Sequence, residues 1–128
     1  MIDAIQNLDL NFVIERLTEK QRWSQEDASE AVRRYKNFLV LHYLYPAKKL
    51  VPTTDIDEAW HAHILFTREY ANHCQTIFHK YLHHVPTRSS PSKEEKEEMH
   101  LAYCSTSVLY RQEFQEPYSL QLDVSTFW

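Results

Sequence analysis

Residues 54–84 read TDIDEAWHAHILFTREYANHCQTIFHKYLHH, and this stretch decides which fold the chain can adopt. Its apolar residues recur at steps of three and four, the spacing that places side chains on one face of an α-helix. The residues on that face are Ile56, Trp60, Ile64, Thr67, Tyr70, Cys74, Ile77, Phe78 and Tyr81. The pattern predicts helix over residues 55–81 with a break near Thr67, and Thr54 and Asp57 fit a capping box at its start.

Helical signals also flank this stretch on both sides. Ser24 is a predicted N-cap, followed by acidic residues and a helical pattern that ends at Pro46, and a weaker amphipathic pattern covers residues 8–22. Ser92 and Glu95 form another capping-box signature, which opens a predicted helix over residues 92–114. The tail, residues 115–128, contains the alternating sequence YSLQLDV and is predicted to be extended.

The composition narrows the fold class and the function. The chain has 128 residues and no glycine, so it is predicted to be one domain over residues 1–128, without a Gly-rich phosphate-binding loop. A net charge of -4 argues against binding to nucleic acid or to an anionic membrane surface. No signal peptide or membrane-spanning segment is recognisable, which predicts a cytoplasmic protein. The predicted fold is all-α, a small bundle of four to five helices with an extended C-terminal tail.

Histidines cluster in the central stretch together with aspartate and cysteine, the side chains that ligate transition metals. Asp57 and His61 lie four residues apart and therefore on one helical face, where both could ligate an ion or the aspartate could orient the imidazole. Asp57 fits a purely capping role equally well. His63 is about 200° around the helix from His61, so we expect His61 to face inward and His63 to lie at the surface.

The remaining candidate ligands come later in the chain. Cys74 is four residues after Tyr70 on the same face, although a buried cysteine is often only a small apolar side chain. His83 and His84 follow the predicted helix, where either could turn back toward the bundle or simply complement the helix dipole. The predicted metal ligands are His61, Asp57, Cys74, His83 and His84. The residues predicted to support them or to contact a ligand are Trp60, His63, Tyr70 and His79.

The segment from RRYKNFLVLHYLYP to LHHVP, roughly residues 32–86, resembles the glycine-rich domain-containing protein-like family. The motifs that carry the resemblance are D-I-D, W-H-x-H, the Tyr70 and Cys74 pair, and the closing L-H-H-V-P. This family occurs as small bacterial proteins and within larger plant and fungal ones, and the resemblance implies importance for the residues in those motifs. The Gly-rich tail is absent here, and His79 occupies a position where the family is expected to favour glycine.

These observations support two hypotheses about function. The first is a transition-metal site, with zinc preferred over iron or copper, and with metal-dependent catalysis on an unidentified substrate left open. The second is a non-catalytic interaction module whose polar cluster is a structural hydrogen-bond network and whose C-terminal tail binds a protein partner. The sequence does not determine the oligomeric state.

Overall fold

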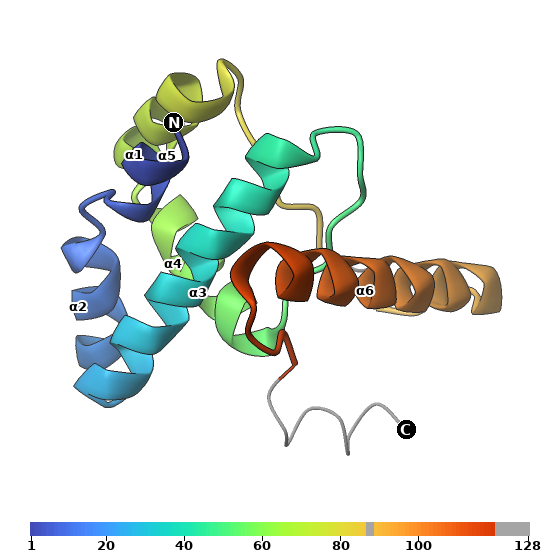
Figure 1. The fold of residues 1–128 in the computed structure, drawn as a ribbon. Coiled ribbons are helices and arrows are strands. Elements are labelled where there is room, and N and C mark those ends of the chain that lie inside the picture. Colours follow the sequence, from blue (N-terminus) through green and yellow to red (C-terminus); the bar gives the residue numbers. More distant parts are fainter. Residues whose placement is uncertain (87–88, 120–128) are drawn as a thin grey trace.

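The computed structural model describes residues 1–86 and 89–119, and its regular elements are all helices (Figure 1). In chain order these are α1 (Ile2–Gln6), α2 (Asn11–Glu19), α3 (Gln25–Leu44), α4 (Thr54–Leu65), α5 (Thr67–Phe78) and α6 (Lys93–Phe114). The all-α prediction is confirmed. Short α1 was not expected, and it raises the number of described helices to six. The predicted extended tail lies mostly outside the described residues, which end at residue 119.

Helix α3 is the centre of the molecule, and α1, α2, α4 and α6 all pack against it. Its start is as predicted, because the Ser24 side chain accepts a hydrogen bond from the Asp27 amide. A continuous run of side chains from Phe38 to Leu41 is buried, so this part of α3 has apolar neighbours on every side. The helix ends at Leu44, and its C-cap Tyr45 directly precedes Pro46.

The predicted break in the central stretch is confirmed and falls at Phe66. Its backbone angles, φ -89° and ψ 73°, are outside the helical region, and its amide donates to the carbonyl of His63. The predicted capping box at Thr54 and Asp57 is wrong. Helix α4 has Thr53 as its N-cap, without a side-chain capping bond, and the Thr53 hydroxyl donates to Asp55 instead.

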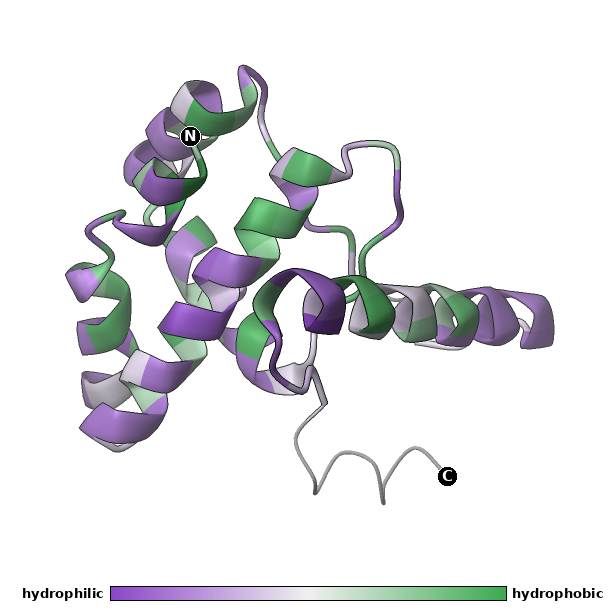
Figure 2. Ribbon diagram, viewed as in Figure 1, coloured by the Kyte–Doolittle hydropathy of each residue, from purple (hydrophilic) through white to green (hydrophobic). Residues whose placement is uncertain are grey.

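Helix α6 extends away from the other five helices (Figure 1). The predicted capping box at its start is confirmed, because Ser92 accepts from the Glu95 amide and Glu95 accepts from the Ser92 amide. Its outer half is hydrophilic and its apolar residues lie nearer α3 (Figure 2). None of the helices in the described ranges combines the length and the apolar character needed to span a bilayer.

Candidate functional site

Four of the five predicted ligands line one cleft, of about 740 Å³, which we call the His84 cleft. Its walls come from the α3–α4 connection, the first turns of α4, the segment after α5, and single residues of α3 and α6. The lining residues are His42, Lys48, Lys49, Leu50, Val51, Pro52, Thr53, Thr54, Asp57, Glu58, Trp60, His61, His83, His84, Val85, Pro86 and Met99. Cys74 is not among them.

Two of the residues that line this cleft, an aspartate and a histidine, form a pair. His84 Nε2 is 2.5 Å from Asp57 Oδ1, although the two residues are 27 positions apart in the chain. The His84 ring also stacks on Trp60, with ring centroids 4.2 Å apart. Stacking and the carboxylate together fix the imidazole plane, so this histidine is held in one orientation at the cleft surface.

His42 is a lining residue of the cleft that the sequence reasoning missed. Its Nε2 is buried without a hydrogen-bond partner among the described residues, while its ring packs edge-on against Phe38. Burial, with a smaller contribution from the charge of Lys80, lowers the pKa of His42 to about 4. The neutral ring therefore has an unsatisfied nitrogen, which costs about 1–3 kcal/mol unless another group bonds to it. A histidine four residues after Phe38, on an apolar stripe, was the available sequence signal.

The orientation predicted for the two histidines of the W-H-x-H stretch is wrong, because His61 is exposed and His63 is 1% exposed. His63 continues the apolar stripe of α4, three residues after Trp60 and seven after Ile56. The prediction follows the helical phase of Asp57, which lies beside that stripe. The correct phase places His63 against α3.

His63 belongs to a buried chain of polar side chains. Its Nδ1 is 2.8 Å from the Tyr35 hydroxyl and its Nε2 is 3.0 Å from Nδ1 of His73. Burial, and secondarily the neighbouring His73, lower the pKa of His63 to about 3. With both ring nitrogens engaged and the ring neutral, His63 connects α3, α4 and α5 as a structural group.

Tyr70 and Cys74 form a second buried group beside this chain. The Tyr70 hydroxyl accepts from Trp60 Nε1 at 2.9 Å and donates to the carbonyl of Leu82, which ties the segment after α5 to α4. Burial raises the pKa of the Cys74 thiol. A protonated thiol in such surroundings is a poor ligand and a poor nucleophile.

The metal-binding prediction is wrong. Within residues 1–86 and 89–119, no three side chains of histidine, cysteine, aspartate or glutamate are grouped so that they could hold a metal ion. His61 points to solvent, Asp57 pairs with His84, and Cys74 lies with Tyr70. His79 is also exposed and has a left-handed backbone, with φ 58°.

Comparison with known proteins shows longer relatives that contain a similar segment. Glycine-rich domain-containing protein 2 of Arabidopsis thaliana is 34% identical over 93 residues, which are 70% of this chain and 12% of that protein. Glycine-rich domain-containing protein 1 of the same plant is 38% identical over 71 residues, which are 52% of this chain and 9% of that protein. The chain thus spans about a tenth of the length of these relatives. No solved structure matches it.

A family model described as UCP032817-like matches residues 3–116, which is a longer segment than the one that suggested the resemblance. The match includes all of α2 to α6, the His84 cleft and the buried histidine chain. The chain therefore belongs to the UCP032817-like family, and its predicted resemblance to the glycine-rich domain-containing proteins is confirmed.

Proposed function

We propose that this domain is a peptide-binding module, and that the His84 cleft holds a short acidic segment of a partner protein. The observation that carries the proposal is the unpartnered Nε2 of His42 in a residue that lines the cleft. Buried polar groups are nearly always hydrogen-bonded in folded proteins, and a ligand that reaches this nitrogen from the cleft would supply the missing bond. A peptide backbone offers both donors and acceptors.

The chemistry of the cleft walls supports a peptide rather than a purely apolar ligand. Lys48 and Lys49 are exposed at one wall and would attract carboxylates, while the acidic lining residues, Asp57 and Glu58, come from α4, where Asp57 pairs with His84. Val85, which is 81% exposed, supplies apolar contact area together with Pro52 and Pro86. The relatives contain a similar segment within much longer chains, as expected for a module that contributes one contact of several. This site differs from the predicted partner site in the C-terminal tail, which stays a prediction.

A random-peptide display library, panned against the wild-type domain, tests the proposal. We expect enriched peptides rich in Asp and Glu, with dissociation constants measurable by fluorescence polarisation. His42→Phe keeps an aromatic ring but removes the nitrogen, and Lys49→Glu reverses a wall charge, so both should weaken binding at least about tenfold.

Lys20→Glu is the matched control, because Lys20 is equally exposed but lies at the end of α2, outside the cleft. It should leave the affinity unchanged. Enrichment of no peptide, or equal affinity in wild type and both cleft variants, would overturn the proposal.

A further inference from the structure

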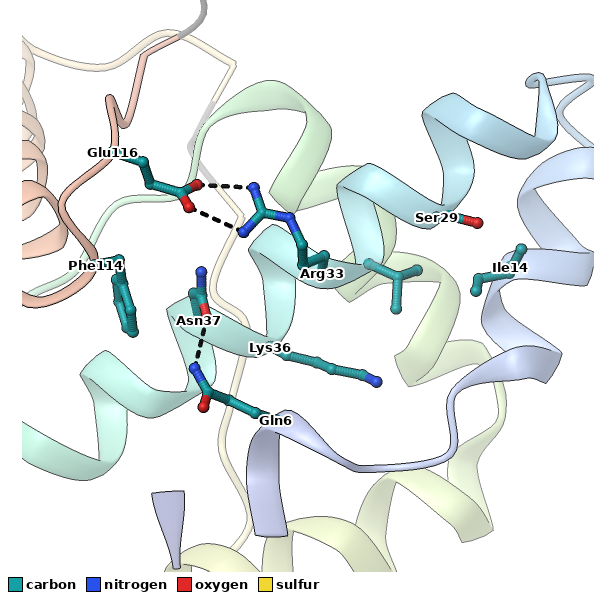
Figure 3. A pocket seen from close by; sticks show the side chains of 9 residues that line it. Gln6, Ile14, Ser29, Arg33, Lys36, Asn37, Phe114 and Glu116 are labelled. Carbon is teal, nitrogen blue, oxygen red and sulfur yellow. Dashed lines mark hydrogen bonds and ion pairs between the residues drawn. The ribbon is translucent and has the colours of Figure 1, made fainter. Parts of the chain in front are cut away.

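A second cavity, of about 440 Å³, lies beside α3 (Figure 3), and it shares no lining residue with the His84 cleft. Helix α3 contributes most of it, and α1, α2 and the end of α6 close it. The residues that line it are Gln6, Ile14, Ser29, Val32, Arg33, Lys36, Asn37, Phe114 and Glu116. The volume falls within the range of small-molecule sites in proteins, which is about 300–1,000 Å³.

The positive charge at one end of this cavity is already neutralised. Arg33 donates from Nη1 and Nη2 to the two carboxylate oxygens of Glu116, each at 2.9 Å, and it also pairs with Glu30. Hydrogen bonding to Arg33 is the main reason that the pKa of Glu116 is lowered, so the carboxylate stays ionised. This bidentate pair has no charge left over for a ligand.

Lys36 is different, because its ammonium group has no hydrogen-bond or ion-pair partner among the described residues. In Figure 3 its side chain extends from α3 toward the side of the cavity where Ile14 lies, and no interaction line reaches its nitrogen. The lysine is partly buried, and burial lowers its pKa, against a smaller opposite effect of Asp9. Asp9 is too distant to form an ion pair, and its Oδ1 accepts from the Asn11 amide.

The polar groups around the cavity are held in fixed positions. Gln6 donates to Asn37 Oδ1 at 3.1 Å, and Asn37 donates to the Tyr110 hydroxyl at 3.2 Å. Ser29 adds a hydroxyl, and the rest of the wall is apolar and comes from Ile14, Val32 and Phe114. A site with one unpaired cation beside an apolar wall suits a ligand that carries one negative charge on an apolar body.

We propose that this cavity binds a small organic carboxylate, with the carboxylate on the Lys36 ammonium and the apolar body along Ile14 and Val32. A charge-assisted hydrogen bond at a partly desolvated site is stronger than the same bond in water. It would also compensate for the hydration that the Lys36 ammonium loses by burial. A multiply charged anion fits less well, because the site has one free positive charge and Glu116 lies at its other end. The proposal is independent of the peptide site.

Titration of the isotopically labelled domain with hexanoate and phenylacetate, followed by NMR, tests this assignment. We expect saturable shift changes at the amides of Ser29, Lys36 and their neighbours, without changes at His84. The uncharged analogues hexanol and 2-phenylethanol should bind at least about tenfold more weakly, which is the effect of losing one charge-assisted hydrogen bond.

Variants separate the site from non-specific binding. Lys36→Met should weaken hexanoate binding at least about tenfold, Lys36→Arg should retain it, and Lys20→Met should have no effect. A melting curve for each variant establishes that it is folded. Absence of saturation by either carboxylate, or equal binding to wild type and Lys36→Met, would overturn the proposal. Equal affinity for inorganic phosphate would also overturn it, because the apolar wall would then have no role.

Discussion

His61 and His63 are two residues apart but have opposite roles in stability. Replacing His63 by alanine would leave a cavity and would remove a hydrogen-bond partner from both Tyr35 and His73. We expect His63→Ala to lower the free energy of unfolding by about 2–4 kcal/mol, and His61→Ala to change it by less than about 0.5 kcal/mol. Denaturant unfolding of both variants measures the difference. Equal losses would mean that the buried histidine chain contributes nothing specific.

The neutral buried histidines also make stability depend on pH. The pKa of His63 is about 3 and that of His42 about 4 in the folded protein, both lowered mainly by burial. An unfolded histidine titrates near 6.5, so the unfolded state binds these protons more readily. Stability is therefore full above about pH 6.5 and is lost as the pH falls toward the folded values.

The expected loss is roughly 2 kcal/mol for each of these histidines between pH 7.5 and pH 5, since one pKa unit corresponds to about 1.4 kcal/mol. Unfolding free energies measured from pH 7.5 to 5 give the slope. His42→Phe should be more stable than the wild type at every pH and should have a slope smaller by about one proton. An unchanged slope would show that His42 titrates in the folded state.

At the scale of elements, Trp60 holds α4 against α3. It is 4% exposed, its ring centroid is 5.4 Å from that of Phe38, and its indole nitrogen donates to Tyr70 on α5. This burial agrees with the place of Trp60 on the apolar stripe of the central stretch. We expect Trp60→Ala to destabilise the protein by about 3–5 kcal/mol, which thermal unfolding would detect. An unchanged melting temperature would contradict this packing role.

The end of α5 stores backbone strain, because His79 adopts the left-handed conformation that glycine takes most easily. This conformation gives a physical reason for the expected preference for glycine at this position, from which His79 departs. His79 is exposed and is the C-cap, so its side chain is dispensable for packing. We expect His79→Gly to stabilise the protein by about 1 kcal/mol, and His79→Ala to give no such gain. Chemical denaturation of the two variants provides the comparison.

At the scale of the whole molecule, Arg34 joins segments from three parts of the chain. It is 3% exposed, forms an ion pair with Asp55 at 2.8 Å, and donates to the carbonyls of Pro117 and Tyr118 beyond α6. We expect Arg34→Met to lower stability by about 3–5 kcal/mol in denaturant unfolding, because the partly buried carboxylate of Asp55 and the two carbonyls lose their partner. Arg33→Met is the control, and its half-exposed ion pairs should contribute at most about 1 kcal/mol.

The helices were predictable because their signals are local. Caps such as Ser24 and Ser92, the prolines and the apolar stripes each depend on a few neighbouring residues. The site was not predictable to the same extent. Asp57 and His84 were both identified as candidates, but their pairing depends on the path of the segment after α5. His42 and Lys36 acquire their environments only when distant helices close around them, and no local pattern contains that information.

Helix α6 projects from the molecule like an arm, and a projecting helix changes how a protein rotates in water. Its 22 residues span about 33 Å at 1.5 Å per residue, and its outer part projects from the packed helices (Figure 1). Rotation that swings this helix through water meets more friction than rotation about the helix axis. The whole domain therefore rotates anisotropically. The axes of α6 and α3 run in different directions (Figure 1), so their peptide N–H vectors make different angles with the projecting helix. The ¹⁵N relaxation rates of α6 and α3 should therefore differ even if both helices are equally rigid. Such a difference results from the shape of the molecule and is not a sign of internal motion.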